Sequence, residues 1–422
     1  MQMDLDTAPT GAANAHARPD VNTTEQGDGT ITSGNADASL SRSVTLLFAI
    51  ASGLAVANAY FAHPLLDVMA EDLDLSPATV GLVVGATQVG YGLGLIFLVP
   101  VGDLVDRRKL VIVQSLLSVL ALVCVGFAPT GAALLAAMAA MGFFAVVTQA
   151  FVAYAASLAR PAERGEVVGT VTSGIVIGIL LARTVAGFLV DVSGWRTVYF
   201  LSAALTLVIA GLLFRMLPAQ EKRGDPMPYP RLIGSLFTLF LQERVLRIRA
   251  ILAMLIFADV TTLLTPLVLP LSAPPYSLSH TAIGLFGLAG VAGALGAARA
   301  GRWADQGLGE RVTGIALALM LVSWLPIALL AHSILWLILG VVILDFGLQA
   351  VHVTNQGLIY RARPEAQSRL TAAYMVFYSI GSALGASCST WVYAHAGWTG
   401  VCLLGAFFAA SALLFWSATL RR

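Results

Sequence analysis

Apolar runs of about 20 residues recur along this chain, and they restrict its fold more than any other feature. A helix that crosses a hydrocarbon layer of about 30 Å needs roughly 20 residues. Lipid offers no partner for unpaired backbone groups, and these runs lack the alternation of a β-strand, so they must be helices. The sequence therefore predicts an all-α integral membrane protein with twelve transmembrane helices. We number them as spans 1 to 12, at residues 44–66, 78–100, 110–128, 132–158, 166–191, 196–217, 248–270, 281–300, 312–331, 333–358, 368–394 and 399–419.

The composition excludes several other classes of protein. Apolar residues make up 58% of the chain and charged residues 11%, with a mean hydropathy of +0.84. A soluble domain carries about a quarter charged residues, so a water-soluble fold is excluded. A net charge of +1 excludes a basic surface that binds nucleic acid. The 3 cysteines and 6 histidines show no metal-ligand spacing, and no ATP-binding loop is present. We expect no metal, no cofactor and no enzymatic activity.

Basic residues fall almost entirely on one side of the predicted spans. Only Arg183 and Arg196 of the 24 Lys and Arg residues lie elsewhere. The positive-inside rule therefore places both termini and that side in the cytoplasm, with the chain in the inner (plasma) membrane. The acidic segment Asp67–Asp74 falls on the other side, which agrees. Residues 1–43 contain no aromatic side chain and predict a disordered cytoplasmic tail.

The chain repeats itself at an offset of about 200 residues. Gly102–Arg107 after span 2 matches Gly301–Gln306 after span 8. Gly194, followed by tryptophan, matches Gly397, also followed by tryptophan. Two parallel repeats of six spans predict two six-helix bundles related by a pseudo-two-fold axis, the layout of an alternating-access transporter. A duplicated receptor or membrane enzyme of the same shape is the alternative.

The repeat also predicts the domain boundaries. We expect one bundle at 44–217 and the other at 248–422. The cytoplasmic loop at 218–247 joins them. Leucines and a phenylalanine alternate with arginines over Arg231–Arg249, which predicts an amphipathic helix lying on the cytoplasmic surface.

Four blocks of sequence resemble the major facilitator superfamily, and more closely its bacterial drug:proton antiporter branch, which includes sugar and nucleoside efflux proteins. These blocks are Asn58–Leu66, Gly102–Lys109, Gly169–Thr184 and Asp345–Gln356. The resemblance covers residues 44–420. It implies that spans 1, 4, 7 and 10 line a central cavity and that the glycine-rich spans 2, 5, 8 and 11 meet between the bundles.

Charged residues inside the spans are the first candidates for proton coupling, because an isolated charge in lipid costs several kcal/mol. Asp259 in span 7 and Asp345 in span 10 are the acids in mid-span, and Arg183 in span 5 is the basic residue there. Asp345 shares one helical stripe with His352, and either group can carry a proton. We expect Arg183 to pair with a carboxylate or to point into the cavity. The alternatives are a static polar network and an arginine that snorkels outward.

Two further sets of residues follow from the sequence. Polar residues in the lining spans are candidates for binding substrate, although an intramembrane amide often bonds a neighbouring helix instead: Asn58, His63, Gln88, Gln149, Tyr154, Gln349, Asn355 and Gln356. The repeated loops after spans 2 and 8 are implied by the resemblance to lock and release the cytoplasmic side: Gly102, Asp103, Asp106, Arg107, Arg108, Gly301, Arg302 and Asp305. Topological anchoring is the alternative for the basic members.

These features together predict a secondary active transporter that works by alternating access. We expect proton-coupled efflux of a small organic molecule such as a drug, a sugar or a nucleoside-like compound. An uptake symporter or facilitator of the same fold is the alternative, and a membrane sensor that transports nothing is a more distant one. The expected partners are the substrate, protons and the lipid bilayer, with the chain acting as a monomer and without nucleic acid.

Overall fold

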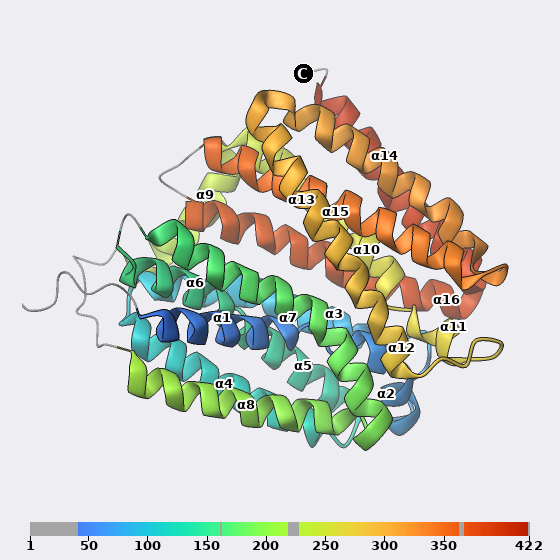
Figure 1. The fold of residues 1–422 in the computed structure, drawn as a ribbon, viewed down its shortest axis with the longest axis horizontal. Coiled ribbons are helices and arrows are strands. Elements are labelled where there is room, and N and C mark those ends of the chain that lie inside the picture. Colours follow the sequence, from blue (N-terminus) through green and yellow to red (C-terminus); the bar gives the residue numbers. More distant parts are fainter. Residues whose placement is uncertain (1–40, 161–162, 218–227, 363–366, 421–422) are drawn as a thin grey trace, which may run out of the picture. The chain divides into compact units, whose positions relative to one another are not determined.

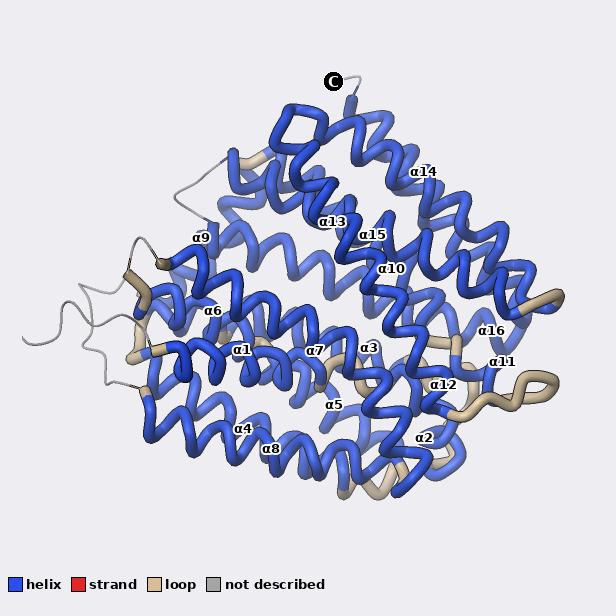
Figure 2. The backbone as a smooth tube through the Cα atoms, in the orientation of Figure 1, coloured by secondary structure: helices blue, strands red, loops and turns tan. Residues whose placement is uncertain are grey.

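The computed structural model describes residues 41–160, 163–217, 228–362 and 367–420. Regular structure in these ranges is entirely helical (Figures 1 and 2). Most of the predicted N-terminal tail, residues 1–40, lies outside the described residues. The helices are α1 (Arg42–Ala57), α2 (Leu66–Asp72), α3 (Leu82–Phe97), α4 (Arg107–Gly126), α5 (Gly131–Ala145), α6 (Val147–Leu158), α7 (Arg164–Ser193), α8 (Trp195–Met216), α9 (Tyr229–Gln242), α10 (Arg244–Leu264), α11 (Val268–Ser272), α12 (His280–Gly284), α13 (Gly290–Trp303), α14 (Gly309–Ala328), α15 (Ile334–Ala362) and α16 (Gln367–Leu420). Short helical turns are η1 (His63–Leu65), η2 (Val99–Asp103), η3 (Leu285–Ala289), η4 (Ala304–Leu308) and η5 (Leu329–Ala331).

The expected twelve spans are present in this set of helices. In the described part of the chain, 9 helical segments are long and apolar enough to cross a membrane. The longest, α16, contains both span 11 and span 12, because Gly397 interrupts its helical backbone with a φ of 63°. Shorter apolar helices, α1 and the segment from α12 into α13, supply spans 1 and 8. The predicted all-α fold of twelve transmembrane helices is therefore confirmed.

The internal repeat is visible where each bundle turns between its last two spans. Gly194 ends α7 with a φ of 83°, and Gly397 has a φ of 63° at the equivalent place in α16. Both values lie in the left-handed region, which glycine adopts without a steric penalty. The tryptophan that follows each glycine is anchored, since the indole of Trp195 donates to Asp72 and that of Trp398 donates to the carbonyl of Ile327. In both repeats, a glycine in the left-handed region followed by a hydrogen-bonded tryptophan thus forms the turn before the last span.

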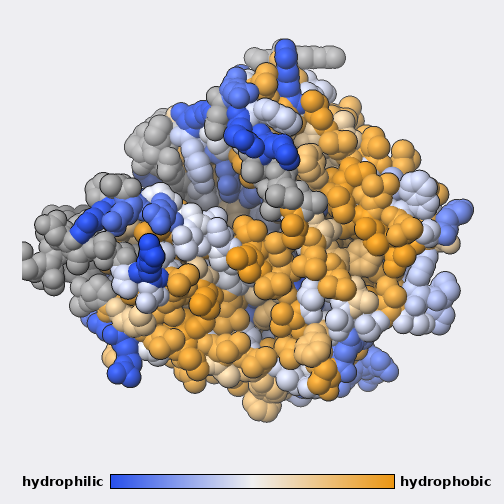
Figure 3. Space-filling model, in the orientation of Figure 1, coloured by the Kyte–Doolittle hydropathy of each residue, from blue (hydrophilic) through white to orange (hydrophobic). Residues whose placement is uncertain are grey.

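Hydrophobic side chains cover the middle of the helices, and hydrophilic ones gather near their ends (Figure 3). Large apolar residues such as Ile50, Leu325 and Leu414 are more than half exposed, as expected for side chains that face lipid. The two ends of the bundle differ in charge. We call the end with Arg107, the start of α7 and helix α9 the basic side, and the end with Asp67 and the start of α12 the acidic side.

Glycines bring the predicted pairs of spans into close contact. Gly81 on α3 packs against the backbone of Ala386 on α16, which joins span 2 to span 11. Gly187 on α7 packs against the backbone of His280, which joins span 5 to span 8. A β-carbon at either glycine would lie less than 2.5 Å from a backbone oxygen. The expected meeting of spans 2, 5, 8 and 11 between the bundles is confirmed, because only small residues let helices approach so closely.

The amphipathic helix of the inter-bundle loop differs from its prediction in extent and in place. Helix α9 ends at Gln242, and the following arginines begin α10 and span 7. Its apolar face, with Leu232, Leu236 and Leu239, is buried against the protein. The hydroxyl of Tyr229 also donates to the carbonyl of Phe97 at the end of α3, over 2.7 Å. The amphipathic pattern therefore reflects packing on both bundles rather than a face that lies freely on the membrane surface.

Gly178→Ala is expected to destabilise the protein, because the new methyl group would lie 2.3 Å from the carbonyl oxygen of Gly53 where α7 crosses α1. Overpacking of this kind costs about 1–3 kcal/mol. Gly169→Ala on the same helix is the matched control, since nothing lies within 4 Å of that position. Thermal unfolding in detergent should show a lower midpoint for the first variant only. Equal midpoints would show that the crossing is not tightly packed.

Candidate functional site

A pair of tyrosine hydroxyls joins the two halves of the chain. Tyr60 lies in the turn after α1, and Tyr378 lies on α16. Their oxygens are 2.8 Å apart and hydrogen-bonded. A hydroxyl removed from water needs such a partner, because an unsatisfied polar group in an apolar interior costs free energy. This contact ties span 1 of the first bundle to span 11 of the second.

Arg183 on α7 lies beside the tyrosine pair. Its guanidinium carbon is 5.6 Å from the centre of the Tyr60 ring, in a cation–π arrangement. Its Nε atom is buried and has no hydrogen-bond partner among the described residues. Asp345 on α15 lies near enough for its charge to act on both Arg183 and Tyr60. Among the described residues, however, no ion pair joins Asp345 to Arg183, so the predicted pairing is not a direct contact in this structure.

The glycines of span 8 let the two charged residues approach each other. A β-carbon at Gly287 would lie 3.3 Å from the Cβ of Arg183. One turn further on, a β-carbon at Gly290 would lie 3.0 Å from the Oδ2 of Asp345. Gly293 packs in the same way against the side chain of Gln349. A helix without side chains on this face therefore packs against both Arg183 and Asp345.

Amides and a second aromatic ring extend the site towards span 4. The buried side chain of Gln88 lies close to the hydroxyl of Tyr378. The Tyr91 ring meets the Tyr378 ring edge to face at 6.4 Å, and its hydroxyl accepts a hydrogen bond from Gln149 over 3.5 Å. We define the central cluster as Tyr60, Gln88, Tyr91, Gln149, Arg183, Asp345 and Tyr378. Its members come from spans 1, 2, 4, 5, 10 and 11.

His63 borders the central cluster on its acidic side. Its ring stacks on Tyr60 at 6.0 Å, and its Nδ1 lies 3.3 Å from the Tyr60 carbonyl oxygen. The side chain is 4% exposed, and Nε2 has no partner among the described residues. A small cavity lined by His63, Arg183 and Phe286 lies next to it. His63 therefore lies at the edge of the site, in the wall of the small cavity, with no hydrogen-bond partner for one nitrogen among the described residues.

The polar stripe predicted on span 10 divides between two neighbours. Asp345 and Gln349 face the glycines of α13. His352 turns to α16, with its Nδ1 2.9 Å from the Tyr374 hydroxyl and its Nε2 3.3 Å from the Nε2 of Gln356. The imidazole is therefore held in a local hydrogen-bond network beside the central cluster.

Asp259 does not join this site. It is fully buried, and its Oδ1 accepts a 2.8 Å hydrogen bond from the indole of Trp324 on α14. The contact lies inside the second bundle, between spans 7 and 9. Asp259 therefore contacts a neighbouring helix of its own bundle through one oxygen, while its Oδ2 is buried without a hydrogen-bond partner among the described residues.

Three of the expected substrate ligands are likewise helix contacts. Asn58 accepts a hydrogen bond from Ser202 over 2.6 Å, which joins spans 1 and 6. Asn355 is fully buried and lies 3.5 Å from the guanidinium of Arg249. Tyr154 is buried at the basic end of span 4, where it interacts electrostatically with the loop between spans 2 and 3. In this structure the described contacts of these side chains therefore join neighbouring helices, which is the alternative to substrate binding.

The loop after span 2 is held within the first bundle. Asp106 caps α4 by accepting a 2.8 Å hydrogen bond from the backbone N–H of Arg108, as a carboxylate at a helix N-terminus does. Arg107 donates to the carbonyl of Ala153 over 2.7 Å, and Arg108 donates to the carbonyl of Phe214. Asp106 thus caps a helix, and the contacts described here for Asp106, Arg107 and Arg108 lie within the first bundle.

The structure describes only some of the side chains of the remaining candidate gating residues. Gly102 lines a cavity on the basic side, and Gly301 packs 3.4 Å from Val353. Arg302 is exposed. The side chains of Asp103 and Asp305 lie outside the described part of the structure.

A cavity on the basic side reaches towards the central cluster. It lies among spans 2, 3, 4 and 11 and is covered by α9. Its polar lining comes from Arg107, Gln114, Gln149 and Arg369, and Leu232 of α9 covers it. Since Gln149 also bonds to Tyr91, one amide belongs to both the cavity wall and the central cluster.

Comparison with known proteins agrees with this architecture. A family model described as Major Facilitator Superfamily matches residues 48–306 and 250–422. The chain belongs to the major facilitator superfamily. It is a membrane transporter and not an enzyme. The uncharacterized transporter YgaY of Escherichia coli O157:H7 is 46% identical over 377 residues, which cover 89% of this chain and 95% of that protein. The probable transporter SCO4007 of Streptomyces coelicolor is 30% identical over 375 residues, which cover 88% of this chain and 86% of the other.

Solved structures of this superfamily share the fold. An inward-facing bacterial homologue of the human lysosomal transporter Spinster matches with a TM-score of 0.71 and 14% identity, over 89% of this chain and 95% of that one. The nucleoside transporter NupG matches with a TM-score of 0.68 and 14% identity, over 89% of this chain and 99% of the other. At this identity the match concerns the fold of the transporter alone.

Sequence reasoning missed the tyrosines at the centre of the transporter. Tyr60, Tyr91 and Tyr378 were not among the expected site residues, because an aromatic ring in an apolar run is compatible with ordinary packing. The available signal was the hydroxyl, since three phenolic groups in predicted membrane spans each need a polar partner.

Asp259→Asn is expected to leave transport intact, because the amide oxygen of asparagine can accept the same hydrogen bond from Trp324. Trp324→Phe should instead lower the stability by about 1–3 kcal/mol, since it leaves the buried carboxyl group without its donor. Thermal unfolding in detergent measures the second effect, and substrate flux in vesicles measures the first. Loss of flux in a stable Asp259→Asn protein would return this residue to the transport mechanism.

Proposed function

We propose that this transporter exports a small organic molecule across the inner membrane in exchange for protons, and that Asp345 carries the coupling proton. The observation that supports this most directly is the position of Asp345, whose Oδ2 lies against Gly290 of span 8, one turn from Gly287, against which Arg183 of the first bundle packs. Alternating access requires contacts between the bundles to form and break. A titratable group located among such contacts can link its proton to the conformational change.

Two opposing effects determine whether the carboxyl group of Asp345 is charged or neutral. Burial favours the neutral carboxylic acid, and the nearby Arg183 guanidinium favours the carboxylate. A movement that separates α7 from α15 weakens the effect of Arg183, and water entering between the bundles weakens the effect of burial. The protonation of Asp345 is therefore linked to the arrangement of the bundles, and this is the physical basis of coupling.

The substrate would bind among the remaining members of the central cluster. Aromatic rings at Tyr60, Tyr91 and Tyr378 offer flat surfaces, and the amides of Gln88 and Gln149 offer donors and acceptors. Gln349 lies close to Asp345 through the Gly293 contact, and His63 borders the other end. Rings beside amides suit a compact polar molecule such as a drug, sugar or nucleoside-like compound, because each can stack and hydrogen-bond at once.

We place the basic side of the bundle in the cytoplasm, with both termini, and we treat one chain as the working unit. The clustering of Lys and Arg on that side supports the orientation. The substrate would then enter through the cavity beside Gln149 and Arg369, from which α9 would have to withdraw. Loops after spans 2 and 8 would reset that side during the cycle.

Asp345→Asn is expected to abolish proton movement linked to substrate, because asparagine cannot exchange a proton at neutral pH. Purified protein in vesicles containing a pH-sensitive dye, tested against drugs, sugars and nucleosides, measures this directly. The parent should move protons when a transported compound is added. Proton flux in the Asp345→Asn protein should fall to the level of vesicles without protein, while counterflow of labelled substrate continues.

Asp259→Asn is the matched control, since it makes the same substitution at a buried carboxyl group outside the central cluster. It should behave like the parent protein. If both variants still change the internal pH on addition of substrate, Asp345 does not carry the proton and the proposed coupling is refuted.

A proton symporter is the second candidate function. The location of Arg183 favours symport if the substrate is an anion. An anionic substrate would compete with the Asp345 carboxylate for the guanidinium. It would then bind best when Asp345 is protonated, so that proton and substrate travel together. The vesicle assay separates the two candidates, because protons and substrate move in opposite directions in exchange and in the same direction in symport.

A further inference from the structure

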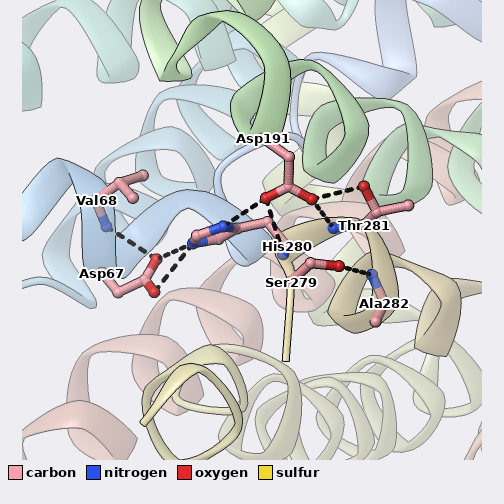
Figure 4. A network of polar contacts seen from close by, with 7 residues as sticks. All are labelled: Asp67, Val68, Asp191, Ser279, His280, Thr281 and Ala282. Carbon is pink, nitrogen blue, oxygen red and sulfur yellow. Dashed lines mark hydrogen bonds and ion pairs between the residues drawn. The ribbon is translucent and has the colours of Figure 1, made fainter. Parts of the chain in front are cut away.

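His280 joins three elements on the acidic side of the bundle (Figure 4). Its Nε2 lies 3.1 Å from both carboxylate oxygens of Asp67 on α2. Its Nδ1 lies 2.9 Å from the Oδ1 of Asp191 at the end of α7. Asp67 and Asp191 belong to the first bundle, and His280 lies directly before span 8 of the second, so these contacts hold the two bundles together at this end.

The protonation state of the imidazole decides whether both contacts of His280 can be hydrogen bonds. A neutral imidazole has one N–H donor and one acceptor nitrogen, whereas the imidazolium form donates from both nitrogens. Ionised carboxylates only accept. Both nitrogens of His280 face carboxylate oxygens at hydrogen-bond distance. In the closed arrangement, each nitrogen of His280 therefore needs a proton that it can donate to its carboxylate. This requires the imidazolium form of His280 while both aspartates are ionised.

We propose that Asp67, His280 and Asp191 form a proton-binding site that keeps the acidic side of the transporter closed while it is occupied, and that loss of this proton permits that side to open. The ligand of the site is a proton from the solution on the acidic side. This inference goes beyond the central coupling reaction. It requires only that the acidic side opens during transport, and it holds whichever ion or substrate drives the cycle.

The two aspartates hold His280 in different ways. Asp191 also accepts hydrogen bonds from the backbone N–H groups of His280 and Thr281, at 3.1 and 2.8 Å, and from the Thr281 hydroxyl at 2.7 Å. None of these donors titrates in the physiological range, so these hydrogen bonds of Asp191 to the start of α12 do not depend on pH while the acidic side is closed. The contact of Asp67 with His280 runs through the imidazole alone. The Asp67–His280 pair is therefore the part of the site that depends on the proton.

Few other charges act on His280. On α2, Glu71 and Asp72 are exposed, and Asp72 is paired with Arg196. On α7 and η1, Arg183 and His63 lie deeper, beside Tyr60. Neither α11 nor η3 contains a charged residue. Among the described residues, the charges that contact His280 are thus its two carboxylate partners.

The direction of the pH effect follows from these contacts. The hydrogen bond to Asp67 raises the pKa of His280 above its usual value of 6.5, partial burial opposes this, and Asp191 adds to the rise. In an open state without these partners the pKa returns towards 6.5. The proton therefore stabilises the closed state fully below pH 6.5, and this stabilisation disappears as the pH rises through the higher value. Alkaline conditions should favour opening of the acidic side.

Distance measurements between spin labels on the two bundles test this directly. Cysteines at Ala132 and Ala331, both exposed on the acidic side, provide the label sites after Cys124, Cys388 and Cys402 are replaced by Ala. In nanodiscs at pH 5.5 the short distance should dominate. The ratio of long to short distances should rise by about tenfold per pH unit between the two pKa values, because one proton is released. A distribution that stays the same from pH 5.5 to pH 8.5 would overturn the proposal.

Substitutions at the site sharpen the result. His280→Gln should remove the pH dependence, because glutamine does not titrate. Asp67→Asn should weaken it, because only the contact of His280 with Asp191 then remains charged. His280→Arg keeps a permanent cation with two donor groups and should stay closed at pH 8.5. Asp72→Asn and His332→Gln are the matched controls on the same side, and both should titrate like the parent. Parental titration in His280→Gln, or its loss in His332→Gln, would assign the effect to another group.

The outcome is separate from that of the central proposal. Asp345→Asn should retain the pH-dependent distances even where proton-linked transport is lost. If the Asp67 or His280 variants do not fold, the titration of the parent protein still decides whether closure depends on a proton.

Discussion

A hydrocarbon interior cannot solvate charge, and this constraint organises the polar contacts of the transporter. Each ionisable side chain kept away from water has to find its partner on another helix. The guanidinium of Arg183 lies over the Tyr60 ring, with Asp345 nearby, and Asp259 accepts a hydrogen bond from the indole of Trp324. The same requirement decides whether a charged residue is structural or available for function. A partner inside one bundle moves with it, whereas a partner in the other bundle can be lost when the bundles move.

Glycine determines which helices can come close enough to supply these partners. In span 8, Gly284 and Gly287 pack against α7, and Gly290 and Gly293 pack against α15. A side chain at any of these positions would push the backbone away from Arg183 or Asp345. The central cluster thus depends on residues that contribute no chemistry of their own. This also explains why glycine-rich spans coincide with contacts between the bundles, where close approach is needed.

Contacts between the bundles occur at two levels with different chemistry. In the central cluster, a guanidinium, a carboxyl group and two tyrosine hydroxyls meet across the middle of the helices. On the acidic side, an imidazole lies between two carboxylates. On the basic side, Asp106 caps α4, and Arg107 and Arg108 donate to carbonyl groups of the first bundle. A cavity on that side lies beside Gln149.

The sequence by itself determined the membrane-spanning helices, the repeat and the family, because each of them follows from local patterns of hydropathy, glycine and charge. It also identified Asp345 and Arg183, since a charge within an apolar run is visible without a structure. Only the tertiary structure decided that Asp259 belongs to the interior of the second bundle, that Tyr60 meets Tyr378, and that His280 lies between Asp67 and Asp191. The physical reason is that the direction of a side chain depends on which helix packs beside it. Residues 213 positions apart, such as Asp67 and His280, leave no signal of their contact in the local sequence.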